Sequence, residues 1–499
     1  MKKRTFLLLI MLGLAVFFVV LAVSKTPRLL SVSRQVEPNK IPNTKSYAGN
    51  KITLLVNGVN SNEQRIKNIK EADTILIKTF EFRDDETGND LIKLLAEKAK
   101  SGAKIFIQFD VNGTRHTPSE QKNIWLGRES PIPSNLEKLF NESRGRVFIM
   151  PTSVPERFFN YFKSLFGLYI PNDHQKYLIT WNSRDLSSPV KAILGGLNIG
   201  DEYMFGGIKD SRGKYKIVPR YHTYAFRDTD VQVIGAVVQD IIKQYIDDAN
   251  YYAHNQNKYY RKYIYPNVME SINQLTILSN KLQASKKTAF PDRAGQASVS
   301  FIVNSRGDSS KNINETFSAM LDQLPKGTVV KLVTPLFLPT EEIQNKILSA
   351  ANNGVKFSIL TSSLYSADSD FARVARASHC RYRYLIKRAP ENAFEFYEWN
   401  GNENIGLGGL HQKVYSFGES KAAPFMIGSL NLDYHSLVYN AEDVLLIQDQ
   451  AQKILFDQML AKDYSPATAT RWSASQLENE SLSAKFLECF DDWVFHRVL

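Results

Sequence analysis

One triplet occurs twice in this chain, and its repetition constrains the fold more than any other feature. Residues 174–176 and 411–413 both read His-Gln-Lys, and each triplet leads into a short apolar run typical of a β-strand. Each is followed by a glycine-led element that ends in asparagine, at residues 195–198 and 428–431. A single His-x-Lys is weak evidence of function. Two copies of the compound pattern indicate a duplicated unit.

The apolar periodicity repeats as well. The chain has 499 residues, beyond the size at which a single hydrophobic core stops growing. Strands alternate with amphipathic helices in both halves, an order typical of α/β architecture. It predicts two similar lobes, residues 49–283 and 298–499, each a mixed β-sheet flanked by helices, with a linker at 284–297. The expected strands are 52–56, 74–80, 104–109 and 226–233, then 299–303, 329–333 and 356–360.

The N-terminus predicts a membrane segment over residues 1–25. A basic head precedes an uncharged apolar run, residues 6–23, which just reaches the length of a spanning helix. We favour an uncleaved anchor, because the basic head indicates a cytoplasmic N-terminus and so places the rest of the chain on the extracytoplasmic side. Residues 22–24 nonetheless resemble a cleavage site, which would make the body a secreted protein. Residues 26–48, rich in Pro, Ser, Asn and Lys, predict a tether.

Charge and cysteine content narrow the partners. The formal net charge of +11 favours anionic partners, a phospholipid surface or nucleic acid, although it can also serve solubility alone. Cys380 and Cys489 are the only cysteines, which excludes a disulfide framework but allows a single bridge between them. No cluster has metal-ligand spacing, so we expect no metal and no cofactor. The sequence carries no signal for a protein partner.

An aromatic stripe lies just before the first triplet. Phe158, Phe162 and Phe166 recur at helical spacing, with further aromatic residues beside them. Such a stripe is often part of a core. Aromatic residues with polar tips also suit a membrane interface, so the segment is equally a candidate flap that contacts acyl chains or binds lipid substrate.

The repeated residues suit phosphoryl chemistry. Strand alternation places His174 with Lys176, and His411 with Lys413, so each lobe offers one imidazole and one ammonium. One imidazole can attack phosphorus while the other, protonated, donates to the leaving oxygen. Lysine and asparagine supply donors to the remaining phosphoryl oxygens. The predicted substrate is a phosphodiester, bound by residues that include Asn198, Asn431, Gly196 and Ser429.

A nucleophilic histidine also needs a carboxylate on its other nitrogen, which sets the tautomer and stabilises the charged ring. Asp228 follows the first glycine-led element, and Glu442 follows the second. We therefore predict that these two carboxylates support the histidines.

These motifs resemble those of the phospholipase D superfamily, whose pattern is His-x-Lys-x4-Asp-x6-Gly-[Gly/Ser]-x-Asn. The resemblance runs from about residue 50 onward, and residues 195–203, 226–229 and 397–398 are most similar to the bacterial cardiolipin synthase branch. It implies a cleft holding both His-Lys pairs, no metal, and a covalent phosphohistidine. It also implies His174 as nucleophile and His411 as general acid.

The chain departs from that pattern at the motif aspartate. Trp181 and Gly418 occupy the two corresponding positions. Asp185 and Glu419 are the nearby acids that could substitute.

The motifs, the charge and the N-terminal segment lead to three candidate functions. The first is a membrane-anchored phospholipase D-type enzyme, which hydrolyses a phospholipid or transfers its phosphatidyl group to an alcohol. The second is a nuclease of the same superfamily, with a basic groove and stacking aromatics. The third is a non-catalytic module that binds lipid or a partner through the phosphate pocket.

Overall fold

The computed structural model describes residues 44–114, 130, 132–143, 145–152, 172–185, 188–255, 258–305, 312–364 and 372–498. The predicted anchor and the aromatic segment with Phe158, Phe162 and Phe166 lie outside these ranges. Within them, none of the helices combines the length and apolar character needed to cross a bilayer.

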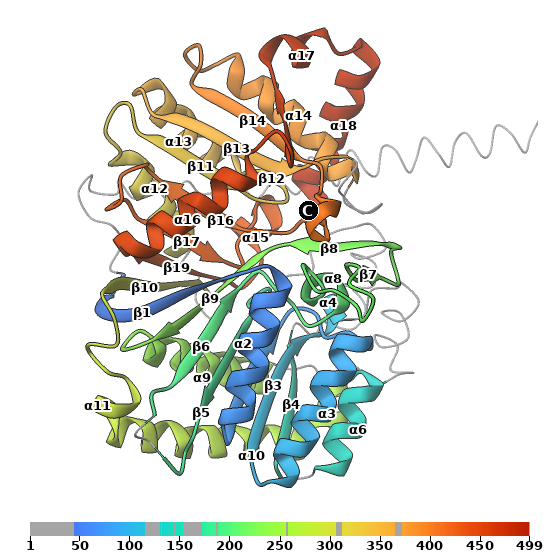
Figure 1. Cartoon of the computed structure of the whole chain (residues 1–499), viewed down its shortest axis with the longest axis vertical. Helices are drawn as coiled ribbons and strands as arrows, with labels where there is room; N and C mark the ends of the chain where they lie inside the picture. The colour runs from blue at the N-terminus through green and yellow to red at the C-terminus, as the bar shows by residue number, and fades with distance from the viewer. Residues whose placement is uncertain are drawn as a thin grey trace, which may run out of the picture. The chain divides into compact units, whose positions relative to one another are not determined.

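A mixed sheet of fifteen strands passes through both halves of the chain (Figure 1). Its first-half strands are β1 (Ser46–Val56), β2 (Thr74–Thr79), β3 (Lys104–Asp110), β4 (Val147–Thr152), β5 (Tyr177–Trp181), β6 (Lys191–Gly195) and β9 (Thr229–Ile234). Its second-half strands are β10 (Ala297–Asn304), β11 (Val329–Val333), β13 (Lys356–Ser362), β14 (Phe394–Trp399), β16 (Val414–Phe417), β17 (Phe425–Gly428), β19 (Glu442–Gln448) and β20 (Ala469–Trp472). The predicted mixed α/β fold is confirmed.

The strand order repeats outward from the centre. β1 and β10 pair antiparallel in the middle, followed by β9-β6-β5-β2-β3-β4 on one side and β19-β17-β16-β11-β13-β14-β20 on the other. β2 lies antiparallel to β5 and parallel to β3, and β11 has the same relation to β16 and β13. The lobe limits near residues 283 and 298 stay a prediction, because one sheet joins the halves.

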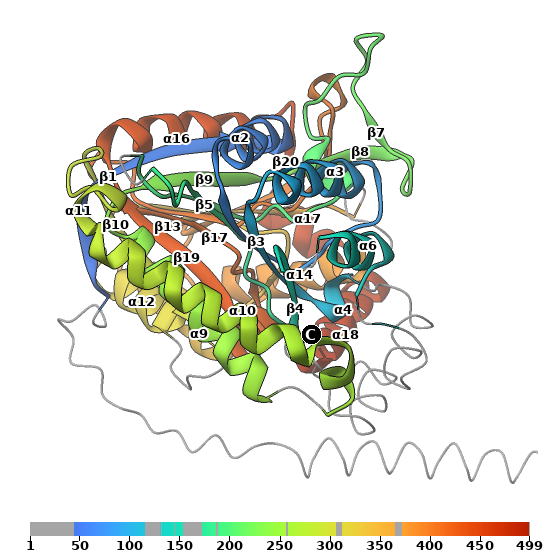
Figure 2. The same ribbon diagram turned by 90° about the horizontal axis from the view of Figure 1, so that it is seen from below.

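Helices cover both faces of the sheet (Figure 2). α2 and α16 pack against β1 on one face, whereas α9, α10 and α12 lie on the other. The longer helices are α2 (Asn57–Glu71), α3 (Glu86–Lys100), α6 (Ser134–Glu142), α9 (Val238–Asn255), α10 (Lys258–Ala284), α12 (Asn312–Asp322), α13 (Glu341–Asn352), α14 (Ala372–Ile386), α16 (Gln450–Asp463) and α18 (Leu482–Val498).

Shorter elements complete the described chain. The short helices are α4 (Val111–Thr114), α8 (Asp201–Met204), α11 (Lys286–Ala289), η1 (Glu403–Ile405), α15 (Tyr434–Val438) and α17 (Ala474–Asn479). A separate three-stranded sheet, ordered β15-β8-β7, contains β7 (Ile217–Val218), β8 (Thr223–Arg227) and β15 (Leu407–Leu410). The short strands β12 (Phe337–Leu338) and β18 (Leu432–Asp433) pair with each other.

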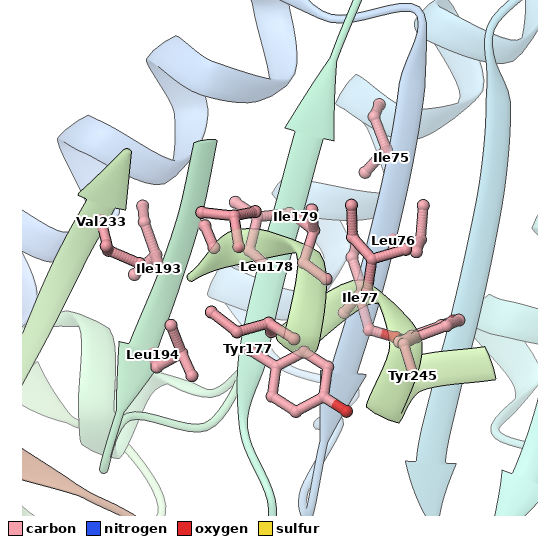
Figure 3. Packing of buried hydrophobic residues seen from close by; sticks show 14 of the residues in the cluster. Ile75, Leu76, Ile77, Tyr177, Leu178, Ile179, Ile193, Leu194, Val233 and Tyr245 are labelled. Atoms are coloured by element: carbon pink, nitrogen blue, oxygen red, sulfur yellow. The ribbon is translucent and has the colours of Figure 1, made fainter. Parts of the chain in front are cut away.

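The central strands are apolar along nearly their whole length because helices bury both faces. Every residue of β2 and of β5 is buried, and their side chains interdigitate in Figure 3. Tyr177 of β5 meets Tyr245 of α9 edge to face, with ring centroids 6.2 Å apart. This core holds β5 rigidly, and the first His-Gln-Lys triplet immediately precedes that strand.

Several predicted boundaries need correction. β1 begins at Ser46, so the predicted tether overlaps the sheet by three residues. The predicted strand over 226–233 is broken at Asp228 into β8 and β9, which belong to different sheets. α10 was not predicted, because its tyrosine-rich beginning lacks a clear apolar stripe. The predicted linker contains α11 and joins β10 directly.

A disulfide joins Cys380 of α14 to Cys489 of α18. Several ion pairs reinforce the same helix pair, among them Arg376 with Asp491 and Arg381 with Asp492. The bridge closes a loop of 109 residues in sequence separation, so it removes much of the conformational freedom of the unfolded chain.

We expect the double substitution Cys380→Ser/Cys489→Ser to destabilise the second half by about 2–4 kcal/mol, the usual cost of losing a native disulfide. The measurement is the melting temperature of both proteins, with the wild type repeated in a reducing agent. The reduced wild type should match the variant. An unchanged melting temperature in both would show that the helix packing alone holds α18.

Candidate active site

Each His-Gln-Lys triplet lies just before a strand, which corrects the prediction that it opens the strand. Lys176 precedes β5 and Lys413 precedes β16. Lys176 Nζ turns back to donate to the His174 carbonyl oxygen at 2.5 Å, and Lys413 does the same to the His411 carbonyl. The ammonium and the imidazole of each triplet therefore lie together, as expected, through this turn and not through strand alternation.

Each histidine is paired with the carboxylate of the other half. His174 Nδ1 lies 3.0 Å from Glu442 Oε2, and His411 Nδ1 lies 2.6 Å from Asp228 Oδ2. Both carboxylates are fully buried. The two predicted supporting acids are thus brought to the histidines. Because both carboxylates lie at Nδ1, Nε2 is the reactive position of each ring, and Lys413 Nζ lies 2.9 Å from that atom of His411.

The backbone fixes this crossover. The His174 amide donates to the Ala441 carbonyl at 2.9 Å, and the His411 amide donates to the Arg227 carbonyl at 2.9 Å. Ala441 and Arg227 are the residues immediately before the two carboxylates. The same arrangement therefore occurs twice.

Further hydrogen bonds orient the carboxylates. Asp228 lies at the break between β8 and β9, where its Oδ1 accepts from the Thr229 amide at 2.7 Å. Glu442 opens β19 and accepts from Ser429 Oγ at 2.5 Å and Asn440 Nδ2 at 3.2 Å. These bonds hold each acid with a free oxygen lone pair toward its histidine.

A buried ion pair between the halves supports Asp228. Arg227 donates to both carboxylate oxygens of Asp463 in α16, each at 2.8 Å. It also donates to the Asp228 carbonyl at 2.7 Å. Sequence reasoning missed this pair, because an arginine and an aspartate so far apart in the chain carry no mutual signal.

Aromatic rings enclose both imidazoles. Phe80 meets His174 edge to face at 4.8 Å, and Tyr203 meets His411 at 5.1 Å. Phe226 stacks on His411 at 5.5 Å. The Tyr203 hydroxyl donates to Glu81 at 2.9 Å, which brings an unpredicted acid to the site. Tyr203 lies close to the first glycine-led element, and that position was its only sequence signal.

The two predicted asparagines each present a buried amide atom. Asn198 Oδ1 accepts from the Glu81 amide at 3.2 Å, while its Nδ2 has no hydrogen-bond partner among the described residues. Asn431 Oδ1 is likewise buried and unsatisfied within that part of the chain. Such groups are costly unless a ligand completes them. Both therefore suit a polar ligand in the site.

Burial and crowded positive charge shift the titration of the site. The pKa of His174 is lowered by burial, against the opposing pull of Glu442. The pKa of His411 falls well below its usual value through burial and then through the neighbouring lysines. Burial also lowers the pKa of Lys413 to about 7 and raises that of Asp228 to about 6. An anion would reverse the two histidine shifts and the lysine shift.

Gly196 and Ser429 hold equivalent places beside the two carboxylates but differ in size. A Cβ added at Gly196 would lie 2.3 Å from Asp228 Oδ1, so no larger residue fits there. At Ser429 the side chain instead bonds to Glu442. Both residues therefore pack against the carboxylates and help to position them. Their predicted role in substrate binding stays a prediction.

Comparisons with known proteins agree with this geometry. Residues 321–464 match the family model "Cardiolipin synthase, PLD-like domain". Cardiolipin synthase A of Pseudomonas syringae pv. syringae is 26% identical over 431 residues, which cover 86% of this chain and 71% of that protein. Cardiolipin synthase A of Pseudomonas entomophila is 23% identical over 421 residues, which cover 84% and 70%. The chain therefore carries a PLD-like domain in its second half and is similar to cardiolipin synthases over most of its length.

A solved structure shares the fold of this chain. Phosphatidylserine synthase of Haemophilus influenzae Rd KW20 matches with a TM-score of 0.59 and 14% identity, over 91% of this chain and 97% of that one. At that identity the likeness concerns the fold.

The candidates for the missing motif aspartate are wrong. Asp185 is exposed on a turn, and Glu419 is 66% exposed and lies 4.0 Å from Lys331. Trp181, at the motif position itself, is buried in the core of the first half. An apolar side chain therefore replaces the acid at that position, and the reciprocal carboxylates remain in place.

One group in the described part of the chain has ligand atoms close enough to surround a metal ion: His379, Glu480 and Glu488. Its carboxylates already have cationic partners. Arg383 pairs with both glutamates, and His379 Nε2 lies 2.6 Å from Glu398. Although burial opposes it, these carboxylates raise the pKa of His379 to about 10. The ring is then a charged donor, which suits an ion-pair cluster better than a metal ligand.

We expect Gly196→Ala to lower turnover by about a hundredfold or more, because the added methyl displaces Asp228 from His411. Ser429→Ala is the matched control, since it removes one of three hydrogen bonds to Glu442 and should cost about tenfold or less. Turnover and melting temperature are measured for both. Equal losses in two stably folded variants would contradict the steric argument.

We expect binding of a phosphate analogue to take up protons. His411 and Lys413 are largely or partly deprotonated at neutral pH, and an anion stabilises their charged forms, so affinity should fall as the pH rises above about 7. Calorimetric titration with tungstate in two buffers of different ionisation enthalpy measures the uptake. His411→Gln should reduce it. Proton release, or uptake unchanged by that substitution, would contradict the pKa pattern.

Proposed function

We propose that this chain is a phospholipase D-type enzyme that transfers the phosphatidyl group of a phospholipid through a phosphohistidine. The observation that carries the proposal is the reciprocal pairing of His174 with Glu442 and of His411 with Asp228. Two imidazoles in one polar site, each held by an acid at Nδ1, provide two Nε2 atoms for two proton-coupled roles.

In the first step His174 Nε2 attacks phosphorus, and the bond to the leaving alcohol breaks. Protonated His411 donates its proton to that alcohol oxygen. Glu442 stabilises the positive charge on the phosphorylated ring. Lys176, Lys413 and the amides of Asn198 and Asn431 stabilise the developing charge on the other phosphoryl oxygens.

In the second step an acceptor hydroxyl attacks the phosphohistidine. His411, now neutral, takes the hydroxyl proton while the bond between phosphorus and nitrogen breaks. Water as acceptor gives hydrolysis, and an alcohol gives a new phosphodiester. The enzyme is then back in its starting state.

The relatives favour a lipid alcohol as acceptor. Two matched proteins are named cardiolipin synthases, and each alignment covers more than two thirds of both chains. Aromatic walls around the imidazoles also limit access for water. The predicted anchor and flap agree with a membrane substrate, and both stay predictions.

The nuclease and the binding module remain the alternatives. A nuclease would cleave single-stranded nucleic acid at the same histidines. A binding module would bind phosphate analogues without turnover.

We expect the full chain to convert a defined phospholipid in mixed micelles, with added glycerol shifting the products from hydrolysis to transfer. His174→Ala and His411→Ala should each reduce turnover at least a hundredfold to a thousandfold, because each removes one of the two proton-coupled roles. His254→Ala, an exposed histidine of α9, is the control and should match the wild type.

The covalent step has its own readout in the same samples. Phosphate attached to His174 should accumulate in His411→Ala, where breakdown of the intermediate lacks a base. Phosphate on His411 in a His174-intact protein would reverse the roles. Wild-type rates in either alanine variant would exclude the two-histidine mechanism, and cleavage of nucleic acid alone would favour the nuclease.

A further inference from the structure

A basic segment projects from the three-stranded sheet beside the active site. This projection, residues 207–224, contains β7 and the loops on either side of it. Figure 2 shows β7 and these loops standing clear of α2 and α3. Its basic residues outnumber its single acid, Asp210, by five to one: Lys209, Arg212, Lys214, Lys216 and Arg220.

Part of that charge is neutralised within the protein. Arg212 pairs with Asp210, and Lys216 pairs with Glu86. In the described part of the chain, Lys209, Lys214 and Arg220 form no ion pair with a carboxylate, and all three are exposed. The projection therefore carries at least three positive charges toward solvent.

Exposed aliphatic side chains accompany this charge. Ile217 of β7 is 50% exposed, and Ile405 of η1 is 41% exposed. η1 comes from the second half and packs on the projection, since a Cβ at Gly406 would contact the Tyr215 ring at 2.6 Å. It also adds one exposed acid, Glu403. The result is a mixed basic and apolar tip built by both halves.

The strands of the projection lead directly to the histidine site. β8 ends at Arg227, immediately before Asp228, and β15 ends at Leu410, immediately before His411. β8 and β15 pair in parallel, with Leu410 opposite Arg227. The Asp228–His411 pair therefore lies at the ends of β8 and β15. A partner that binds the projection contacts the opposite end of these strands, where β8 begins.

We propose that the projection docks on an anionic phospholipid bilayer and orients the site toward its lipid substrate. Lysine and arginine are attracted to the negative surface of such a bilayer, while isoleucine inserts at the headgroup boundary. A nucleic acid is the poorer fit, because the exposed apolar side chains are aliphatic and cannot stack on bases. The tyrosines of the projection are only partly exposed, and the rings of Tyr215 and Tyr221 lie against Lys209 and Arg220. The inference rests on the proposed function, since it assumes that the substrate lies in a membrane.

The test uses the full chain in nanodiscs, with an environment-sensitive dye on Ile217→Cys. The native cysteines are bonded to each other, so the new thiol is labelled selectively. The emission should shift to shorter wavelength in discs that contain phosphatidylglycerol but not in discs of phosphatidylcholine alone. The dye reports contact without turnover, so this outcome is independent of whether the chain is an enzyme.

Charge removal completes the experiment. Lys209→Gln/Lys214→Gln/Arg220→Gln should abolish the shift, because each charge changes membrane partitioning by about fivefold. Lys281→Gln/Lys286→Gln/Lys287→Gln is the matched control. It removes three exposed charges at and near α11, far from β7 in both views (Figures 1 and 2), and should keep the shift.

Four results would overturn the proposal. They are no shift in anionic discs, an equal shift in both kinds of disc, persistence of the shift in the first triple variant, and loss of the shift in the control. A shift produced by single-stranded DNA but not by anionic discs would assign the projection to nucleic acid. Lipid turnover that persists without any dye response would leave the proposed function intact and exclude the docking surface.

Discussion

The site depends on the fact that each half of the chain completes the histidine of the other. His174 reaches Glu442, and His411 reaches Asp228, through paired backbone and side-chain hydrogen bonds that cross between the halves. All four groups are largely buried, so separating the halves would leave buried charges unpaired, which costs several kcal/mol for each. Folding, assembly of the halves and completion of the site are therefore one event.

The same crossover explains the electrostatics of the site. Two lysines and two histidines converge in this site, where burial first and their mutual repulsion second lower the pKa of Lys413 and of His411. The unsatisfied Nδ2 of Asn198, a hydrogen-bond donor, points to the same deficiency. What this arrangement lacks is an anion with several acceptor oxygens, and a phosphodiester is such a group. The site is thus preorganised for its ligand. The free-energy cost of bringing these charges together is offset by the stability of the continuous sheet.

Sequence reasoning could name the residues that meet in the candidate site, because local motifs carry them. The histidines, lysines and asparagines repeat in order, and Asp228 and Glu442 follow each repeat. It could not predict which acid serves which histidine, because that depends on strand pairing between residues far apart in the chain. The contact of Tyr203 with Glu81 and the pair Arg227–Asp463 have no periodic signal. The pattern of residues 226–233 predicts a single strand, but Asp228 interrupts it.

The duplicated scaffold carries different side chains in its two copies, and these differences suit two unequal roles. Thr79 and Thr334 make the same turn, each donating to the carbonyl two residues later, yet those residues are Glu81 and Leu336. The side chain of His174 is 9% exposed, whereas that of His411 is 18% exposed. A ring that carries a phosphoryl group must be shielded from water, while a ring that exchanges protons with arriving and leaving alcohols must be reachable. In the proposed mechanism the deeper histidine therefore suits the role of nucleophile, and the more open one, beside Glu81 and Tyr203, suits the role of acid.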